Sequence, residues 1–227
     1  MDAEYWHRKW RDNQIAFHEP QANGLLREHL DRLGLEPGAR VFLPLCGKTR
    51  DIGHLCGLGF RVVGAELSEA AVTQLFSDLD LVPEIQPFDS LRLYSAGPVS
   101  VFVGDVFALD REVLGPVAAV YDRAALVALP PDMCARYVEH VAAMTADAPQ
   151  VVISLEYDQS TMAGPPFSVP EAEIRTLYGG RFSVTLLEAR PISGALAARC
   201  SGSEVAWLLT PGPVAPSAAA PEKDAPR

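Results

Sequence analysis

Residues 40–69 decide the fold and have the sequence RVFLPLCGKTRDIGHLCGLGFRVVGAELSE. The apolar run 40–45 is short and bounded by turn residues, so it predicts a buried strand. A helical stretch over 51–58 comes next, and a second apolar run, 61–65, predicts another buried strand. Strand, helix and strand in alternation predict a parallel sheet with crossover helices.

The rest of the chain extends this alternation, which places the protein in the α/β class. We expect further helices over 25–33, 69–79, 132–144 and 170–178, and further strands over 91–94, 99–103, 117–121, 150–155, 181–187 and 204–209. The turn near Gly97 predicts a hairpin that leads into a core strand. No helix pattern separates the last two strands, which favours an antiparallel hairpin at one edge of the sheet.

We expect one folded domain over 21–210, flanked by two different end segments. The opening segment, 1–20, is rich in aromatic side chains such as Trp6 and Trp10 but shows little strand periodicity. We therefore expect it to lack regular structure and to act as a mobile lid over the site. Residues 211–227, PGPVAPSAAAPEKDAPR, are dominated by Pro, Ala and charge, which is typical of a disordered tail.

Composition and charge exclude several classes of protein. The 227 residues are 48% hydrophobic and 21% charged, which is ordinary for a globular protein. With 29 acidic residues against 19 Lys and Arg, the formal net charge is −10, so we expect neither a nucleic-acid nor a membrane partner. There is no apolar run of about 18 residues, no apolar signal core at the start, and no C-x-x-C pair among the four cysteines. We expect a cytoplasmic protein with reduced thiols and no metal site.

Gly47 and Glu66 carry the first functional signal. In open α/β sheets, ligands bind beyond the carboxyl ends of the strands, which is where these two residues fall. An acidic residue about 20 positions after a glycine turn, at the end of the next strand, suits the hydroxyls of a ribose. Enzymes that bind dinucleotides and enzymes that use S-adenosylmethionine share this feature.

The composition of the glycine turn separates those two classes. Dinucleotide sites need G-x-G-x-x-G to bring the backbone against a pyrophosphate, whereas the turn here has one glycine. A single glycine favours a ligand that has no phosphate, such as a sulfonium amino acid, beside the loop. A phosphate-binding P-loop is excluded because it needs glycine where Phe42 stands. In the plainest interpretation, Gly47 is only a turn and Glu66 is only a charge at the start of a helix.

Five blocks of sequence resemble the bacterial members of the thiopurine S-methyltransferase family. They follow the family's order and cover roughly residues 5 to 210. The blocks are Trp10 with Ala16-Phe17-His18, Phe42-Leu43-Pro44-Leu45-Cys46-Gly47-Lys48, Val62-Val63-Gly64-Ala65-Glu66-Leu67-Ser68-Glu69, Asp122-Arg123-Ala124-Ala125-Leu126-Val127-Ala128, and Gly164-Pro165-Pro166-Phe167-Ser168-Val169-Pro170. The resemblance implies a Rossmann-like class I methyltransferase fold: a seven-stranded, mostly parallel sheet with one antiparallel edge strand and helices on both faces. It also implies S-adenosylmethionine as the methyl donor.

The same resemblance assigns residues to the two substrates. It places the donor against Trp10, Leu45, Gly47, Glu66, Leu67, Asp105, Val106 and Arg123, with Glu66 on the ribose and Asp105 and Val106 near the adenine. It places the acceptor against Phe17, Pro165, Pro166 and Arg123, with Arg199 as the basic residue expected late in the chain. Arg123 is the residue implied to act in catalysis. A plainer interpretation stays open for each of these residues. In it Trp10 only packs the opening segment on the sheet, and Phe17 is a core aromatic. Pro165-Pro166 is only a rigid loop, and Arg123 only pairs with Asp122 or another carboxylate.

The implied reaction is methyl transfer to the sulfur of a thiopurine or of another aromatic or heterocyclic thiol. For bacterial members the resemblance also suggests methylation of selenium or tellurium compounds, a detoxification role that includes tellurite resistance. A methyltransferase acting on an amine or hydroxyl stays open, although Asp122-Arg123-Ala124 lacks the Pro-Pro-aromatic turn of amine-directed enzymes. A nicotinamide-dependent reductase and a non-catalytic acidic binding domain stay open as well. Nothing suggests a repeated apolar face, so we expect a monomer.

Overall fold

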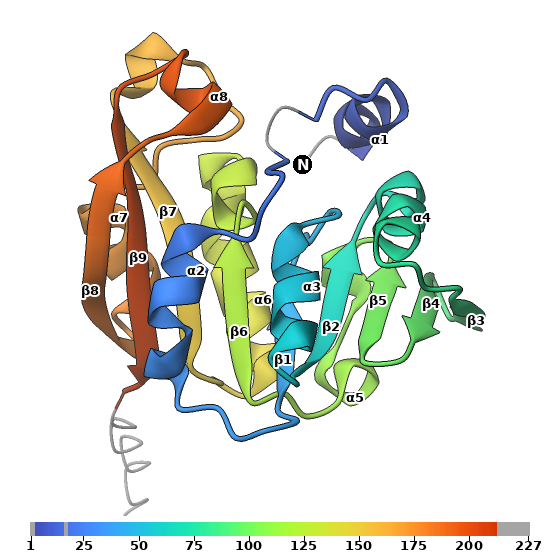
Figure 1. Cartoon of the computed structure of the whole chain (residues 1–227). Helices are drawn as coiled ribbons and strands as arrows, with labels where there is room; N and C mark the ends of the chain where they lie inside the picture. The colour runs from blue at the N-terminus through green and yellow to red at the C-terminus, as the bar shows by residue number, and fades with distance from the viewer. Residues whose placement is uncertain (1–2, 16–17, 213–227) are drawn as a thin grey trace, which may run out of the picture.

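The computed structural model describes residues 3–15 and 18–212 of the chain. The described strands are β1 (Arg40–Leu43), β2 (Arg61–Glu66), β3 (Glu84–Phe88), β4 (Leu91–Ala96), β5 (Val99–Val103), β6 (Ala119–Arg123), β7 (Gln150–Tyr157), β8 (Phe182–Pro191) and β9 (Gly202–Pro211). They form one sheet in the order β3-β4-β5-β2-β1-β6-β7-β9-β8 (Figure 1). Phe17, which the sequence assigns to the acceptor, lies outside the described residues. The expected tail beyond Gly212 lies outside them as well.

Helices cover both faces of this sheet (Figure 1). The α-helices are α1 (Ala3–Arg11), α2 (Gly24–His29), α3 (Arg50–Gly57), α4 (Glu69–Asp78), α5 (Arg111–Leu114), α6 (Pro131–Thr145), α7 (Glu171–Tyr178) and α8 (Gly194–Ala197). Short 3-10 helices are η1 (Leu30–Leu33), η2 (Val106–Ala108), η3 (Leu126–Ala128) and η4 (Gln159–Thr161). The helix predicted over 25–33 is therefore an α-helix followed by a 3-10 turn.

Five central strands, β5, β2, β1, β6 and β7, run parallel, which confirms the predicted parallel sheet. Two differences from expectation lie toward the edges. The described sheet has nine strands rather than seven, because β4 and β3 add an antiparallel extension beyond β5. On the other side the antiparallel strand β9 is not at the edge: it pairs along the whole of β7, which leaves β8 outermost. Both predicted hairpins form, and the short helix α8 lies in the connection of the second.

Side chains of the central strands alternate between the two faces, so each face carries a core. In β1, Val41 and Leu43 join the cluster that contains residues of α2, α3 and α4. Phe42, between them, joins the cluster that contains residues of α5, α6 and α7. A strand that is covered on both faces has a continuous apolar sequence, which is why β1 and β2 can be recognised as buried strands from their sequence.

The opening segment contains a helix, so the expectation that it lacks regular structure is wrong. Helix α1 packs against α4. Trp6 and Trp10 are four residues apart, which places them on one helix face, and Trp10 is buried. An acidic residue in the first turn and basic residues in the last turn also suit the helix dipole. A segment without strand periodicity can still form a helix, and the four-residue spacing of the two tryptophans is the helical signal here.

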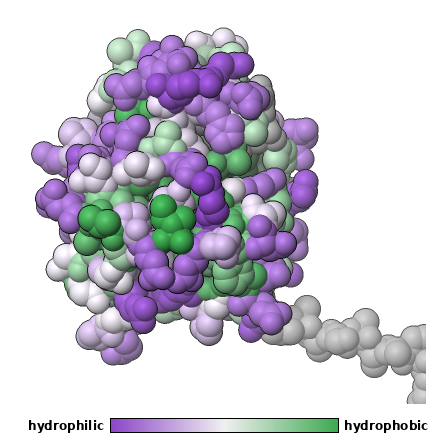
Figure 2. All heavy atoms as spheres, turned by 90° about the vertical axis from the view of Figure 1, so that its right-hand side faces the viewer, coloured by the Kyte–Doolittle hydropathy of each residue, from purple (hydrophilic) through white to green (hydrophobic). Residues whose placement is uncertain are grey.

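Strand β3 is the free edge on the right of Figure 1. All five of its residues are exposed, including Ile85 and Phe88, and Pro87 interrupts the row of edge N–H groups. Figure 2 shows this face, on which apolar side chains are interspersed with hydrophilic ones. The exposed edge therefore carries a proline that discourages strand pairing with another chain.

Candidate functional site

The five parallel strands end at one edge of the sheet, at the top of Figure 1. The loop after β1 contains Leu45 and Gly47, and β2 ends at Glu66. Strand β5 is followed by Asp105, and Arg123 is the last residue of β6. The topology thus brings residues from distant parts of the sequence to the edge where open α/β sheets bind ligands.

The loop after β1 is held against the end of β2 through its backbone. Cys46 N donates to the carbonyl oxygen of Ala65 at 3.0 Å, and Gly47 N donates to Glu66 Oε2 at 2.8 Å. Gly47 has a φ of +53°, in the left-handed region that favours glycine. A Cβ at this position would lie 2.9 Å from Cζ2 of Trp10, so the indole ring covers the loop closely. Both the turn and the indole therefore require glycine here.

The carboxylate of Glu66 is buried rather than turned to solvent, with 7% of the residue exposed. Oε2 accepts the hydrogen bond from Gly47 N, and Oε1 accepts one from Ser68 N at 2.7 Å. Burial raises the pKa of Glu66, and the backbone N–H groups of Ser68, Gly47 and Leu67 offset part of that rise. A carboxylate oxygen has two lone pairs, so each oxygen keeps capacity to accept a hydroxyl. The carboxylate joins the ends of β1 and β2 and is more than a charge at the start of a helix.

Glu66 lies in the wall of a narrow cleft between the ends of β1, β2 and β5. The cleft is lined by Leu45, Ala65, Glu66, Leu67, Gly104, Asp105 and Val106. A wider hollow shares Leu67 and Gly104 with this cleft and reaches His7 of α1 and Arg92 of β4. The lining of the cleft is mostly apolar around one buried carboxylate. The cleft itself holds only about 10 Å³ and the hollow beside it about 400 Å³, so a ligand of nucleoside size needs the space of both.

Arg123 is nearly buried and forms an ion pair with one carboxylate. Its Nη2 lies 2.6 Å from Glu19 Oε1, and the exposed fraction of the two side chains is 11% and 45%, respectively. Burial alone lowers the pKa of Arg123, but Tyr121, Glu19, Asp51 and Glu204 together raise it above its ordinary value. Arg123 therefore stays charged.

Asp122 anchors the turn after β6 and is not the ion-pair partner of Arg123. Successive side chains of a strand point to opposite faces, and Asp122 accepts from Tyr137 Oη at 2.7 Å and from Leu126 N at 3.1 Å. Burial raises its pKa from 3.8 to about 6. The sequence left open a pairing of Arg123 with Asp122 or another carboxylate, and the partner in the structure is another carboxylate, that of Glu19.

The loop that contains Pro165 and Pro166 is fixed to the turn after β6. Tyr157 Oη donates to the carbonyl oxygen of Pro166 at 2.6 Å. Phe167 N donates to the carbonyl oxygen of Val127 at 2.6 Å, and both prolines are half-buried. Because Val127 belongs to the same motif as Arg123, the loop and the guanidinium come from adjoining segments.

Arg199 follows α8 and is exposed. It lies close enough to Tyr157 to offset part of the rise that burial causes in the pKa of that phenol. Arg199 therefore lies on the side of the Pro165 loop. Its predicted contact with the acceptor stays a prediction, as do the roles of the other assigned residues.

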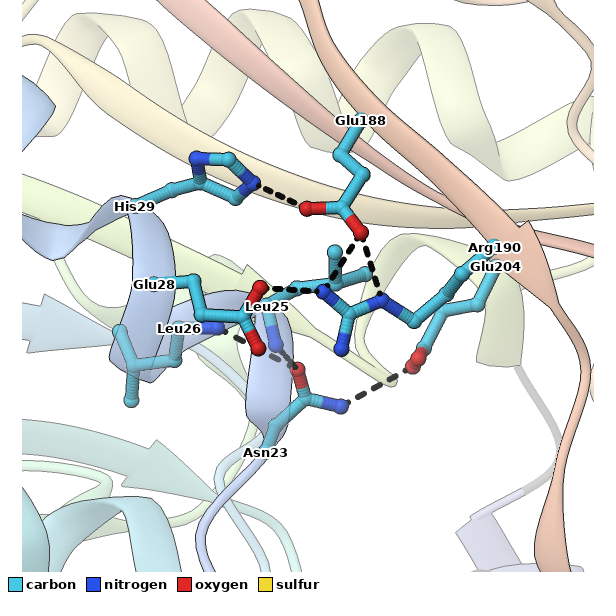
Figure 3. Close-up of polar contacts among 8 residues, drawn as sticks. All are labelled: Asn23, Leu25, Leu26, Glu28, His29, Glu188, Arg190 and Glu204. Atoms are coloured by element: carbon cyan, nitrogen blue, oxygen red, sulfur yellow. Dashed lines mark hydrogen bonds and ion pairs between the residues drawn. The ribbon is translucent and has the colours of Figure 1, made fainter.

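Sequence reasoning missed a polar network that holds α2 against β8 and β9 (Figure 3). Asn23 accepts from two N–H groups in the first turn of α2, and its Nδ2 donates to Glu204 Oε1 at 3.0 Å. Arg190 Nη2 donates to Glu28 at 2.9 Å and to Glu188 at 2.8 Å. Asn23 and Glu204 are far apart in the sequence, as are Glu28 and Arg190, so no local pattern points to these two pairs. Sequence reasoning also missed the ion pair between Glu19 and Arg123, because no local pattern connects these two residues.

The described part of the chain has neither a metal cluster nor a membrane-spanning helix. Within 3–15 and 18–212, no group of three or more His, Cys, Asp or Glu side chains is placed to hold a metal ion. Over the same residues, no helix combines the length and the apolar character that a membrane crossing requires.

Comparison with protein families gives a match over nearly the whole chain. Residues 1–204 match the family described as thiopurine S-methyltransferase. A thiopurine S-methyltransferase of Xanthobacter autotrophicus is 52% identical over 210 residues, covering 92% of this chain and 99% of that protein. One of Gluconobacter oxydans is 46% identical over 212 residues, covering 93% and 96%, respectively.

Solved structures show the same fold at low sequence identity. One is a Burkholderia thailandensis 1,6-didemethyltoxoflavin-N1-methyltransferase with bound S-adenosylhomocysteine, at 17% identity and a TM-score of 0.62, covering 92% of this chain and 87% of that chain. Another is a Synechocystis magnesium protoporphyrin IX methyltransferase with bound S-adenosylmethionine, at 16% identity and a TM-score of 0.61, covering 92% and 94%. At such identities the likeness concerns the fold alone.

Proposed function

The chain belongs to the thiopurine S-methyltransferase family, and on that premise we propose that it transfers the methyl group of S-adenosylmethionine to the sulfur of a thiopurine or a similar aromatic thiol. The family resemblance and the class I methyltransferase fold expected from the sequence are confirmed. The observation that carries the proposal is the cleft between β1, β2 and β5. Five residues assigned to the donor meet in it: Leu45, Glu66, Leu67, Asp105 and Val106.

The residues of this cleft fit S-adenosylmethionine. Glu66 offers a buried carboxylate with spare acceptor capacity for ribose hydroxyls. Leu67 and Val106 provide apolar surface for the adenine, and the carboxylate of Asp105 lies at its exposed rim. The methionine group would lie beside the loop of Gly47, which the indole of Trp10 covers. When bound, S-adenosylmethionine supplies a methyl group on a positively charged sulfur.

Trp10 and the loop it covers would keep water away from the reacting atoms. Methyl transfer to a thiolate disperses charge, so a pocket of low polarity favours the transition state over the charged ground state. Trp10 is 4% exposed and lies against Gly47, at the methionine end of the proposed donor site. Its aromatic face can also attract the positive sulfur, worth about 0.5–2 kcal/mol. We propose that α1, which carries Trp10, is the lid expected from the sequence.

The acceptor would lie between Arg123 and the loop of Pro165 and Pro166. A stiff apolar dipeptide suits a flat heteroaromatic ring, and the hydrogen bonds of Tyr157 and Phe167 fix this loop. Alignment of the acceptor sulfur with the methyl group is the main task, and such positioning supplies up to about 7–11 kcal/mol of barrier reduction. Arg199 is the basic residue proposed at the outer side of this pocket.

The proposed reaction needs no strong general base when the acceptor thiol ionises near neutral pH. Arg123 is the charged group suited to favour the thiolate, because its own charge is held by surrounding carboxylates. Its proposed role is to touch the acceptor sulfur directly or through a water molecule.

We propose that soft selenium and tellurium compounds use the same acceptor pocket, with detoxification as the biological role. Their nucleophilic atoms react by the same displacement as a thiolate.

We also propose that the protein is a monomer that works in a reducing cytoplasm. The described cysteines are free, and Cys46, Cys134 and Cys200 are buried, which together with the net charge of −10 supports this proposal.

A panel of acceptors tests the proposed function. The protein is incubated with S-adenosylmethionine carrying a labelled methyl group and with thiopurines, aliphatic thiols, selenium and tellurium compounds, and matched amines and phenols. We expect the labelled methyl group to be transferred to the aromatic thiols faster than to the other acceptors. Label on an amine or phenol alone would favour an N- or O-methyltransferase, and calorimetric binding of a nicotinamide cofactor without binding of the donor would overturn the proposal.

A further inference from the structure

The ion pair between Glu19 and Arg123 joins two side chains that are held very differently. Arg123 is 11% exposed, whereas 45% of the Glu19 side chain is exposed. Glu19 lies in the connection between α1 and α2, and within the described residues its carboxylate has this one ion pair. A half-exposed carboxylate with a single partner is easily exchanged for another anion.

Two other carboxylates near Arg123 are fixed in place. Asp51 is 1% exposed and accepts from Asn23 N at 2.7 Å and from Tyr121 Oη at 3.1 Å. Glu204 accepts from Asn23 Nδ2 at 3.0 Å. Asn23 therefore ties both carboxylates to the start of α2, and neither is free to leave.

Glu19 is not the only carboxylate that raises the pKa of Arg123. Both Asp51 and Glu204 favour the charged guanidinium. Arg123 is the last residue of β6, and its partner Glu19 is half-exposed, whereas Asp51 is buried. Glu19 therefore occupies the position that an incoming anion would take, while the inner carboxylates stay where they are.

We propose that Glu19 is the exchangeable counter-ion of Arg123 and determines how strongly the site prefers a thiolate over its neutral thioether product. This inference rests on the proposed function, because it takes Arg123 as the group that meets the acceptor sulfur. Glu19 pairs with Arg123 in the empty acceptor site, the thiolate displaces it, and the carboxylate returns when the sulfur loses its charge.

The loss of charge follows from the reaction itself. The thiol gives its proton to solvent before transfer. The acceptor sulfur then forms a bond to the methyl carbon, and the electron pair of the broken bond stays on the donor sulfur. Both sulfurs end as neutral thioethers, so Arg123 loses its anionic partner at that moment. Glu19 is then the nearest replacement.

The test compares binding of a thiolate with binding of its methylated form. The probes are 4-nitrothiophenol, at a pH where it is a thiolate, and methyl 4-nitrophenyl sulfide. Their dissociation constants are measured by calorimetry with S-adenosylhomocysteine present, so that no turnover occurs. The proteins are the wild type, Glu19→Gln, and Glu171→Gln as a matched control. Glu171 forms a 2.8 Å ion pair with Arg175, and each of those side chains is 50% exposed.

In Glu19→Gln we expect the ratio of thiolate affinity to thioether affinity to rise about tenfold, because the thiolate no longer competes with a carboxylate. Glu171→Gln should leave the ratio unchanged. A ratio that stays at the wild-type value in Glu19→Gln, or falls, overturns the inference, since a fall would make Glu19 a fixed support of Arg123. A separate assay of methyl transfer by the wild type reports on the proposed function, so the two failures are distinguishable.

Discussion

The proposed donor side and the proposed acceptor side of the site hold their charged groups in different ways. On the donor side, Glu66 is bonded to two backbone N–H groups at 2.8 and 2.7 Å, so the ends of the strands fix its position. On the acceptor side, Arg123 is held by other side chains, and its closest partner is the half-exposed Glu19. A site fixed by backbone binds one invariant ligand well, whereas a site of exchangeable side-chain pairs accommodates several acceptors.

The largest effect is expected on the donor side, from Glu66→Ala. The variant loses the acceptor for the ribose hydroxyls and leaves the N–H groups of Gly47 and Ser68 without their partner. We expect the affinity for S-adenosylhomocysteine in calorimetry to fall at least about 100-fold, or about 3 kcal/mol. Glu66→Gln, which keeps the shape and one acceptor oxygen, should lose less. An unchanged dissociation constant in both variants would contradict the ribose role.

On the acceptor side, Arg123→Lys should lose more than its conserved charge suggests. A point charge replaces a planar fork that pairs with Glu19 and that we propose also meets the acceptor. We expect kcat/KM for an aromatic thiol to fall about 30-fold, or about 2 kcal/mol, while the dissociation constant of the donor changes much less. Arg175→Lys, in an exposed ion pair with Glu171, is the control and should behave as the wild type. Equal kinetics in the two variants would remove Arg123 from the acceptor site.

A smaller effect is expected from Gly47→Ala, which tests how tightly the donor loop is built. The new Cβ would meet Trp10 at 2.9 Å, so the indole must shift. We expect about a tenfold loss of donor affinity, or about 1.4 kcal/mol.

Gly34→Ala is the matched control, because Gly34 has a φ of +59° with nothing within 4 Å of its Cβ position. Both variants should lose about 1–2 kcal/mol of stability to backbone strain, but only Gly47→Ala should affect the donor. Equal donor affinity in both would show that Trp10 does not matter there.

The smallest effect on activity is expected from Asp122→Asn, beneath the acceptor side. The pKa of Asp122 is raised from 3.8 to about 6, so between these values the folded chain binds a proton that the unfolded chain does not. The contribution of Asp122 to stability is therefore largest at low pH and falls as the pH rises through about 6. At pH 7 the buried charge costs on the order of 3 kcal/mol at most.

We expect Asp122→Asn, whose amide can still bond to Tyr137 and Leu126, to be more stable than the wild type at pH 7. Its advantage should shrink as the pH falls from 7 to 4. Denaturant unfolding at a series of pH values measures this difference. A difference that is independent of pH would mean that Asp122 titrates normally in the folded protein.

The donor side is largely predictable from the sequence because it is built by local rules. Two continuous apolar runs indicate β1 and β2, and a single glycine and an acidic residue at the strand ends mark the loop and the carboxylate. The N-cap role of Ser68 is also visible, and its side chain does accept from the backbone of α4. Such features depend on neighbours in the chain and therefore leave a readable pattern.

The acceptor side is not predictable in the same detail, because its contacts join distant segments. Glu19 meets Arg123, and Asn23 joins Asp51 to Glu204, through side chains brought together by the tertiary fold alone. The position of β9 between β7 and β8 is also a choice among pairings that the sequence of each strand permits. Helix α1 was not predicted for a different reason. The lack of strand spacing in this segment favours an interpretation without regular structure, although its tryptophans have helical spacing.

The central claim is that the buried carboxylate of Glu66 binds the ribose of the methyl donor. A crystal structure of the protein with S-adenosylhomocysteine tests it most directly. We expect the two ribose hydroxyl oxygens to lie about 2.5–3.0 Å from the Glu66 carboxylate, with the adenine between Leu67 and Val106. A structure in which Glu66 has turned to solvent, or in which the nucleoside binds away from the cleft, would contradict it.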